Sequence, residues 1–320
     1  MVNNKSMHKI LQEIAIDART KRKDIARKMR ISPQMVSYLI SRAEKQGLIQ
    51  RYTTDIDPAR FGLINVEVFL SYKHFERETL KEIKRSLEEE EYITYIEELS
   101  HGADMLIEYT VPNLSFFNKR YNIMVEMFGD KIETLSINPV IVKHKFSKNY
   151  LVKRSKRRYE YIYSGDREAL SLSAKSKAVL SELKNKPKRS IMEIANSTGI
   201  NVRTVLSTMR YLLDNNIIRS FSIDMDYKKL DIRSALILIS TKGISNEEIK
   251  RLISLSKSTP EITTVTKLIG KYGIVLKIES LKDYEEILDG IRKEMNFNEY
   301  ILYDSRGIVK NTYIPDDVLQ

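Results

Sequence analysis

The apolar positions of residues 31–52 recur half a chain later, in residues 200–221. Few residues are identical between the two segments, but their apolar positions align one to one. The aligned pairs are Ile31 with Ile200, Val36 with Val205, Ile40 with Met209, Ala43 with Leu212, and Leu48-Ile49 with Ile217-Ile218. Three of these pairs follow the i, i+4, i+7 spacing of a single helix face. The pattern therefore predicts a tandem repeat in which each copy contains an amphipathic helix.

Capping residues mark the ends of the two predicted helices. Ser32 before Pro33 is a typical helix start, and Gly47 supplies a left-handed stop. In the second copy Asn201 takes the starting position, and Asn216 replaces the glycine because asparagine also tolerates the left-handed conformation. We therefore expect the two helices over residues 33–46 and 202–214.

A shorter helix is expected before each of these helices, over "KRKDIARKM" in the first copy and "SIMEIANSTG" in the second. In the second copy Ser190 and Glu193 have the spacing of a capping box. The three or four residues that separate the short helix from the long one match a helix-turn-helix connection. In DNA-binding units of this kind the second helix enters the major groove.

The predicted outer faces of the long helices carry side chains that can donate to base edges and phosphates. The candidate DNA-binding residues on these faces are Gln34, Ser37, Tyr38, Ser41 and Arg42 in the first copy, and Arg203, Ser207 and Arg210 in the second. The short helix of the first copy begins with the basic residues Lys21, Arg22 and Lys23, which are expected to contact the phosphate backbone. Because the outer residues differ between the copies, we expect an asymmetric DNA site and not a palindrome.

Strand-like and helical segments follow each helix-turn-helix in the same order. β-branched and aromatic residues dominate the first strand of each half, "NVEVFLSYK" and "SALILISTK". The order strand, helix, strand, strand, helix, strand predicts a ferredoxin-like domain with both helices on one sheet face. The fold class is therefore α+β, a tandem repeat of a winged helix-turn-helix followed by a ferredoxin-like βαββαβ domain. The other sheet face is expected to be apolar and covered by a second sheet.

Positive charge is concentrated in particular segments of the chain. The expected domains are winged helix-turn-helix units at 1–60 and 167–233, here called reader 1 and reader 2, ferredoxin-like (RAM-type) domains at 61–148 and 234–320, and a basic linker at 149–166. Residues 1–60 carry 13 basic and 6 acidic side chains (+7), whereas residues 61–142 carry 8 and 15 (−7). The net charge of +11 is thus focused near the readers, which predicts double-stranded DNA as the partner.

The most basic stretch lies between the two halves. Residues 143–159, "KHKFSKNYLVKRSKRRY", combine eight basic side chains with aromatic ones and no acidic residue. Such a mixture can lie on a nucleic-acid backbone or enter a minor groove. The alternative is a solvated connection between the halves. The candidate DNA-binding residues of this stretch are Lys153, Arg154, Lys156, Arg157 and Arg158.

The composition argues against several classes of protein. Cysteine is absent, which excludes disulfides and thiolate zinc sites. No apolar run approaches the ~18 residues of a membrane span, and the N-terminus lacks a signal peptide, so we expect a cytoplasmic protein without a membrane partner. The four histidines lack metal-ligand spacing, and neither a Gly-rich phosphate loop nor a serine nucleophile elbow occurs. We therefore expect a non-enzyme with no cofactor and no metal.

The order of the elements resembles the Lrp/AsnC (feast/famine) transcription regulators of archaea and bacteria. The matching residues are Val36, Ile40, Gly47, Leu48, Ile49, Tyr52, Asp57, Phe61 and Gly62 in the first half, and Val205, Met209, Ile217, Ile218, Phe221, Asp226 and Leu230 in the second. The resemblance implies a sequence-specific DNA-binding transcription regulator whose units pair through their sheets. Because two units are fused here, the pair is expected within one chain as a pseudo-dimer, or between chains as a homodimer.

The same resemblance implies a small-molecule effector at the turn between the second and third sheet strands, where the family has Gly-any-Tyr-Asp. This sequence departs from that pattern, with "GAD" in the first half and "GKYG" in the second. The candidate effector-binding residues are Gly102, Asp104, Gly270 and Tyr272. The alternative is that the glycines only close tight turns.

Two other functions are compatible with the predicted architecture. The tandem arrangement also resembles the siroheme decarboxylases, which would need histidine and arginine side chains between the sheets, whereas the second half contains no histidine. A winged-helix protein-docking factor of the transcription machinery would instead use the helical faces on protein. DNA binding is distinguished from docking by a steep loss of affinity with salt, because neutralised phosphates release counterions.

Overall fold

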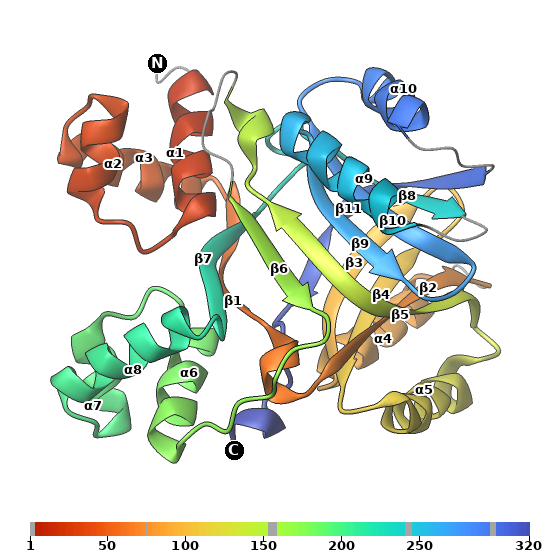
Figure 1. Ribbon diagram of the computed structural model, residues 1–320, viewed down its shortest axis with the longest axis horizontal. Coiled ribbons are helices and arrows are strands. Elements are labelled where there is room, and N and C mark those ends of the chain that lie inside the picture. Colours follow the sequence, from red (N-terminus) through yellow and green to blue (C-terminus); the bar gives the residue numbers. More distant parts are fainter. Residues whose placement is uncertain (1–3, 74–75, 153–158, 241–244, 295–298) are drawn as a thin grey trace.

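The computed structural model describes residues 4–73, 76–152, 159–240, 245–294 and 299–320, and the same order of elements occurs in it twice (Figure 1). The first half contains α1 (Asn4–Ile16), α2 (Arg22–Met29), α3 (Pro33–Lys45), β1 (Ile49–Ile56), β2 (Ile64–Tyr72), α4 (Arg77–Glu89), β3 (Ile93–Ser100), β4 (Met105–Val111), α5 (Leu114–Phe128) and β5 (Ile132–Phe146). The second half contains α6 (Ala174–Asn185), α7 (Ile191–Thr198), α8 (Val202–Asp214), β7 (Ile218–Met225), β8 (Arg233–Ser240), α9 (Asn246–Ser258), β9 (Ile262–Leu268), β10 (Tyr272–Ser280), α10 (Glu285–Glu294) and β11 (Glu299–Asn311). The predicted tandem α+β fold is confirmed.

The long helices α3 and α8 begin and end where their capping residues predict. The side chain of Ser32 accepts a hydrogen bond from the backbone three residues on (3.1 Å), and Asn201 does the same (2.8 Å). Gly47 and Asn216 both adopt the left-handed conformation, with φ values of 64° and 56°. Helix α3 ends at Lys45, one residue before the predicted end. These local signals suffice because a cap acts on the helix that carries it.

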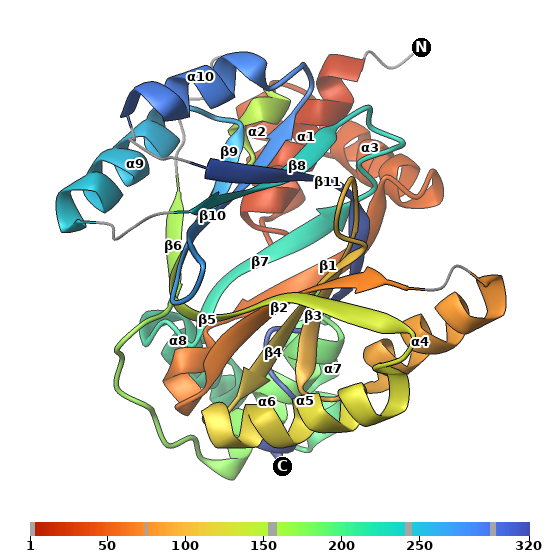
Figure 2. The ribbon, with the colours of Figure 1, turned by 90° about the vertical axis from the view of Figure 1, so that its right-hand side faces the viewer.

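The two four-stranded sheets join into one closed ring. Its order is β2-β4-β3-β11-β8-β10-β9-β5, and a pairing between β5 and β2 closes it. The joints between the halves are β3 with β11 and β5 with β9, both antiparallel. A closed ring leaves these strands without an open edge. Helices α4 and α5 cover one side of the ring, and α9 and α10 cover the other (Figure 2).

The first strands of the two readers pair with each other. Strands β1 and β7 form a separate two-stranded antiparallel sheet, here called the wing ribbon, in which Thr53 lies opposite Ser222. The readers are therefore joined by backbone hydrogen bonds as well as through the ring. This pairing was not predicted, because the partners lie about half the chain apart.

The prediction of an apolar inner sheet face is wrong for part of that face. Around Phe69, Leu106 and Leu238 the interior of the ring is apolar, as expected. Further along the same strands, the inward positions are buried charged side chains. These are Glu67, Glu97 and Glu108 of the first half and Lys277 and Glu279 of the second. The ring can bury them because each has a partner of opposite charge. Lys277 pairs with Glu97, Lys143 pairs with Glu67 and Glu108, and Lys148 pairs with Glu279.

The segment expected as a basic linker also contains regular structure. A short 3-10 helix, η2 (Asn149–Leu151), follows β5, and strand β6 (Glu160–Ser164) folds back onto β5 as an antiparallel partner. Aromatic and β-branched residues in "EYIYS" supply the strand preference. The five basic residues Lys153, Arg154, Lys156, Arg157 and Arg158 lie outside the described residues.

Candidate nucleic-acid interface

The two readers lie on the same side of the ring. In Figure 1 helices α2 and α3 lie at the upper left and α7 and α8 at the lower left, with α4, α5, α9 and α10 on the right. The acidic segment 61–142 supplies α4 and α5, so its two helices lie on the side away from the readers. The second helices of the two helix-turn-helix units, α3 and α8, are here called the recognition helices. They can therefore contact one partner without the acidic helices lying between.

Each recognition helix buries one face in the core of its own reader. Val36 and Ala43 on α3 are fully buried against α1 and α2, and Val205 and Leu212 on α8 are fully buried against α6 and α7. Burying this stripe fixes the rotation of each helix, so the opposite face points to solvent. That face carries the residues predicted to bind DNA.

The predicted contact residues of α3 are mostly exposed. Gln34 and Ser41 are exposed, and Tyr38 keeps 53% of its surface accessible. Ser37 is half-buried, and its hydroxyl oxygen accepts a hydrogen bond from Arg22 Nη1 (2.7 Å). Arg22, predicted to contact phosphate, and Ser37, predicted to face the bases, thus contact each other in the free protein.

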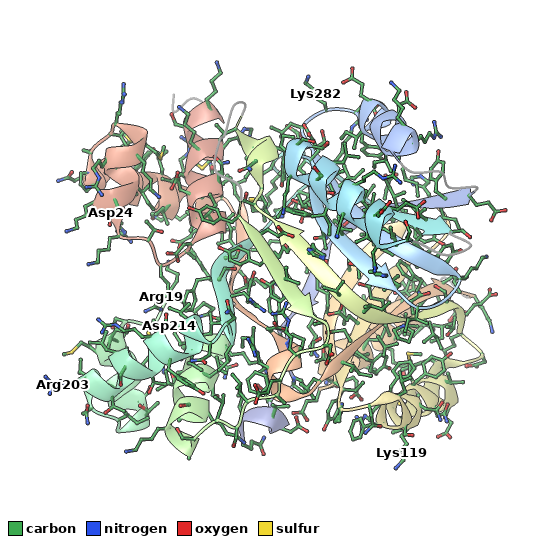
Figure 3. The ribbon with its side chains drawn as sticks, viewed as in Figure 1. Arg19, Asp24, Lys119, Arg203, Asp214 and Lys282 are labelled. Atoms are coloured by element: carbon green, nitrogen blue, oxygen red, sulfur yellow. The ribbon has the colours of Figure 1, made fainter. Side chains whose placement is uncertain are left out.

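The predicted contact residues of α8 point into solvent. Arg203, Ser207 and Arg210 are exposed, and Figure 3 shows Arg203 reaching outward from the reader. Among the described residues no carboxylate forms an ion pair with the side chain of Arg203 or Arg210. Their guanidinium donors are available to a polyanion, since no internal pair has to be broken first.

The other predicted basic residues of reader 1 are similarly placed. Lys21, Arg22 and Lys23 are exposed at the start of α2, and Arg42 is half-exposed on α3. In the part of the chain that the structure describes, none of the four forms an ion pair with a carboxylate. Together with the two arginines of α8, they place six cationic side chains on the reader side of the molecule.

Exposed apolar residues on the recognition helices, Met35 and Leu206 among them, were missed in the sequence. Met35 on α3 and Leu206 on α8 are each 41% exposed and lie beside the predicted contact residues. Apolar side chains in a major groove can contact the thymine methyl group. The available signal was their position off the i, i+4, i+7 stripe, which made them unnecessary for the core.

The two readers are fixed against each other by contacts between side chain and backbone. Arg19, in the turn after α1, donates hydrogen bonds to the carbonyl oxygens of Pro187 (2.7 Å) and Arg189 (2.8 Å) in reader 2. Its guanidinium also lies over the Phe221 ring, 5.1 Å from the centroid. Figure 3 shows Arg19 between the two readers. A rigid arrangement sets the spacing at which the recognition helices can meet DNA.

A second set of contacts between the readers centres on Glu44 of α3. Its carboxylate accepts hydrogen bonds from Lys188 Nζ of reader 2 (2.6 Å) and from the Tyr52 hydroxyl (2.7 Å). Lys188 also lies over the Tyr52 ring, 4.3 Å from the centroid. Partial burial would raise the pKa of Glu44, but the hydrogen bonds from Lys188 and Tyr52 lower it. Glu44 therefore stays ionised and links the readers at neutral pH.

Replacing Arg19 by alanine is expected to loosen the readers. The change removes two charged hydrogen bonds, so the free energy of unfolding should fall by about 2 kcal/mol. DNA whose half-sites are moved apart by one base pair should then bind almost as well as the original spacing. Urea unfolding and binding to a spacing series measure the two effects.

Arg85→Ala is the matched control for Arg19. Arg85 has a side chain 80% exposed on α4 and pairs with Glu89 of the same helix, so its loss should change neither the stability nor the spacing preference appreciably. Equal stability of the Arg19 and Arg85 variants would contradict the rigid connection.

The four predicted effector-binding residues lie in two turns that contact the opposite half. Gly102 has φ 117°, and a Cβ atom there would lie 3.2 Å from the Tyr303 ring. Gly270 has φ 143°, and a Cβ would lie 3.0 Å from Asn138 Oδ1. Asp104 accepts a hydrogen bond from the Tyr72 backbone N–H (2.8 Å), and Tyr272 is buried in the apolar interior. All four residues thus have a structural role, and effector binding by them stays a prediction.

The described residues offer neither a membrane span nor a metal cluster. Across the described ranges, none of the helices combines the length and the apolar character needed to span a membrane. Within the same ranges no cluster of three or more histidine or acidic side chains is arranged to hold a metal ion.

The chain is similar to known transcription regulators in sequence. Residues 3–50 match the winged helix-turn-helix DNA-binding family. An HTH-type transcriptional regulator of Pyrococcus horikoshii is 30% identical over 113 residues, which cover 34% of this chain and 73% of that regulator. One from Pyrococcus furiosus is 29% identical over 124 residues, with 36% and 82% covered. The transcriptional regulator AzlB of Bacillus subtilis is 26% identical over 144 residues, with 45% and 91% covered.

A solved structure has the same fold over almost the whole chain. The siroheme decarboxylase NirDL superposes with a TM-score of 0.59 and covers 98% of this chain and 94% of its own. The sequences are 15% identical, so this likeness shows the fold alone. The relatives in sequence are matched over most of their own length. The chain therefore belongs to the family of HTH-type transcriptional regulators, in the two-unit Lrp/AsnC-like form that the sequence predicted.

Proposed function

We propose that the protein is a sequence-specific transcription regulator that reads one asymmetric site in double-stranded DNA with α3 and α8 together. The observation that carries this proposal is the fixed placement of both recognition helices on one side of a closed ring. Exposed Arg203 and Arg210 on α8, with Lys21, Arg22, Lys23 and Arg42 in reader 1, supply the contacts to phosphates or guanines. We also propose the domain boundaries expected from the sequence, with the readers at 1–60 and 167–233 and the ferredoxin-like domains at 61–148 and 234–320.

One chain supplies both readers in this proposal. The ring closes within the chain and the wing ribbon joins the readers, so a second chain is not required to pair the sheets. At equivalent positions the recognition helices present different side chains, for example Tyr38 against Ser207 and Ser41 against Arg210. Two different helices should select two different half-sites. We also propose a cytoplasmic location, because the proposed partner is DNA.

Selection of bound duplexes from a random pool tests the proposal. We expect an asymmetric consensus of two unlike half-sites about one helical turn apart, ~10 base pairs between centres. Mass measurement of the complex should give one chain per site. A clean palindrome bound by two chains would contradict the pseudo-dimer, because each chain would then contribute the same reader.

We also propose that the protein is not an enzyme. The decarboxylase alternative needs histidine and arginine side chains between the sheets, and among the described residues the cavity there is lined by neither. His144, on β5, instead shares a hydrogen bond with Glu160 on the neighbouring strand (2.8 Å). The likeness to NirDL makes the test worthwhile. Purified protein mixed with siroheme should give no saturable shift of the tetrapyrrole absorption band, and a saturable shift would support the alternative.

A further inference from the structure

A cavity that the reading of DNA does not use is lined by strands of the ring and by part of the wing ribbon. It has a volume of ≈ 130 Å³ and is lined by residues of both halves. Leu106 and Val275 give it an apolar wall, and Glu67, Glu97 and Glu108 give it an acidic one. An engineered protein cavity of ~150 Å³ holds benzene, so this volume suits a molecule of about five or six non-hydrogen atoms.

Two of the glutamates lie directly opposite each other in the sheet. Glu67 on β2 pairs in register with Glu108 on β4, an arrangement in which like charges repel. Lys143 on β5 lies between them, 3.2 Å from Glu67 Oε1 and hydrogen-bonded to Glu108 Oε2. Asn65 donates to the other oxygen of Glu108 (2.9 Å). One ammonium group thus serves two carboxylates.

Glu67 is left with an unpartnered oxygen. The side chain is buried, 3% exposed, and in the described part of the chain its Oε2 has no hydrogen-bond partner. Three other buried polar atoms of the described residues lack partners, in Arg60, Asn138 and Ser234, but these residues do not line the cavity. An unsatisfied buried carboxylate oxygen costs free energy, since water no longer solvates it. Burial and the neighbouring Glu108 and Glu97 accordingly raise the pKa of Glu67 against the pull of Lys143.

Apart from Lys143, the cations around the cavity pair with carboxylates other than Glu67. Lys277 pairs with Glu97 (2.7 Å), whose carboxylate also accepts from Tyr95 and Ser305. Within the described residues six acidic side chains meet five basic ones in and against the cavity wall. The acidic members are Asp55, Glu67, Glu97, Glu108, Asp224 and Glu279, and the basic members are Arg51, Lys143, Lys145, Lys148 and Lys277. With all of these groups ionised, the wall is one positive charge short, and Glu67 is the carboxylate with an unpartnered oxygen.

We propose that this cavity binds a small primary ammonium compound whose charged group donates to Glu67 Oε2. A primary ammonium has three donors and can supply both the missing charge and the missing hydrogen bond. Its short carbon chain would lie against Leu106 and Val275. An anion would meet the acidic excess, and a neutral molecule would leave Glu67 uncompensated. A bulky quaternary ammonium ion would not fit completely into a cavity of this volume and has no N–H group to donate to Glu67.

The cavity also touches the wing ribbon, so its occupant can regulate DNA binding. Asp224 on β7 lines the cavity and forms an ion pair with Arg51 on β1 (3.3 Å). Asn311 on β11 donates to the same carboxylate (3.1 Å). A bound ammonium would thus lie in a cavity whose wall includes part of the ribbon that joins the readers. This regulatory part rests on the proposed function, whereas the binding itself does not.

The binding test uses the full chain and a set of butyl compounds that differ in charge and size. n-Butylammonium chloride should raise the thermal midpoint in a saturable way by a few degrees, with one site per chain by calorimetry. n-Butanol, sodium butyrate and tetrabutylammonium chloride, at matched ionic strength, should not. A similar rise with butyrate or butanol, or no saturable rise with butylammonium, would overturn the proposal.

Glu67→Gln locates the site within the chain. The variant keeps the shape of the side chain but removes its charge, so butylammonium binding should weaken at least tenfold. Glu126→Gln, on the exposed face of α5, should bind as the unchanged protein does. Unaltered binding by folded Glu67→Gln would contradict the site. If that variant fails to fold, the probe series on the unchanged protein decides whether the site exists.

Adding the selected DNA separates this proposal from the proposed function. If butylammonium binds and changes DNA affinity several-fold, the regulatory part stands. If butylammonium binds but DNA affinity does not change, the site stands and the regulatory part is contradicted. Failure of DNA binding in the absence of butylammonium contradicts the proposed function alone, because the thermal measurement does not involve DNA.

Discussion

Replacing Arg203 and Arg210 together by alanine is expected to weaken binding to the selected DNA roughly a hundredfold, about 1.4 kcal/mol for each side chain. Both residues are exposed on α8 and form no ion pair with a carboxylate of the described residues, so their donors are free for DNA. If both contact phosphates, the slope of log affinity against log salt should also fall by about 2. Titration at several salt concentrations measures both quantities.

The control for this double substitution removes the same charge from outside the two readers. Lys119 and Lys282 are exposed and lie away from the readers in Figure 3. Replacing both by alanine should change DNA affinity by less than threefold, because screening weakens charges beyond ~10 Å. Equal losses in the two double variants would mean that α8 is not a recognition helix and that only net charge matters.

Of the substitutions proposed for this protein, Glu279→Gln is expected to lower the free energy of unfolding the most, by about 3–5 kcal/mol at pH 7. Glu279 on β10 is 2% exposed and accepts hydrogen bonds from Lys148 (2.7 Å), Tyr150 (2.6 Å) and Tyr227 (2.8 Å). Glutamine keeps the shape but leaves the ammonium of Lys148 buried without its counter-charge. Urea unfolding of both proteins measures the difference.

The same substitution should show a defined dependence on pH. Burial alone would raise the pKa of Glu279, but Lys148 and Lys277, with hydrogen bonds from Lys148 and Tyr150, lower it from 4.5 to about 2. A depressed carboxyl pKa stabilises the folded state fully above about pH 4.5, and this stabilisation is lost as pH falls towards 2. The gap between the unchanged protein and Glu279→Gln should therefore shrink between pH 5 and pH 2.5. A gap that stays constant over this range would contradict the ionised pair, and Glu126→Gln should show no gap at either pH.

The helices and the predicted contact residues could be found from the sequence because their signals are local. A cap, an apolar stripe and a stop lie within about 15 residues, and together they fix which face of α3 or α8 is exposed. Gln34, Tyr38 and Arg203 were located in this way. The strand order could be predicted because a βαββαβ order fits few topologies. Each of these inferences needs only one element or one half of the chain.

The features that could not be predicted join distant segments. Arg19 contacts Pro187 and β1 pairs with β7, and no periodicity in either segment identifies its partner. The sequence does mark Glu67 and Glu108 as inward residues, since each alternates with apolar neighbours that face the helices. That signal was overridden by the general expectation that an inner sheet face is apolar. Their counter-charge, Lys143, comes from β5, another strand of the same half.

The salt dependence of DNA binding tests the central claim most directly. The full chain is titrated with its selected duplex from about 50 to 300 mM salt, and the logarithm of the association constant is plotted against the logarithm of salt concentration. A straight line with a slope of about −5, from six cationic side chains that neutralise phosphates, is the result predicted for two readers on one duplex. A slope near zero, or binding that does not distinguish the selected duplex from random DNA, would contradict it.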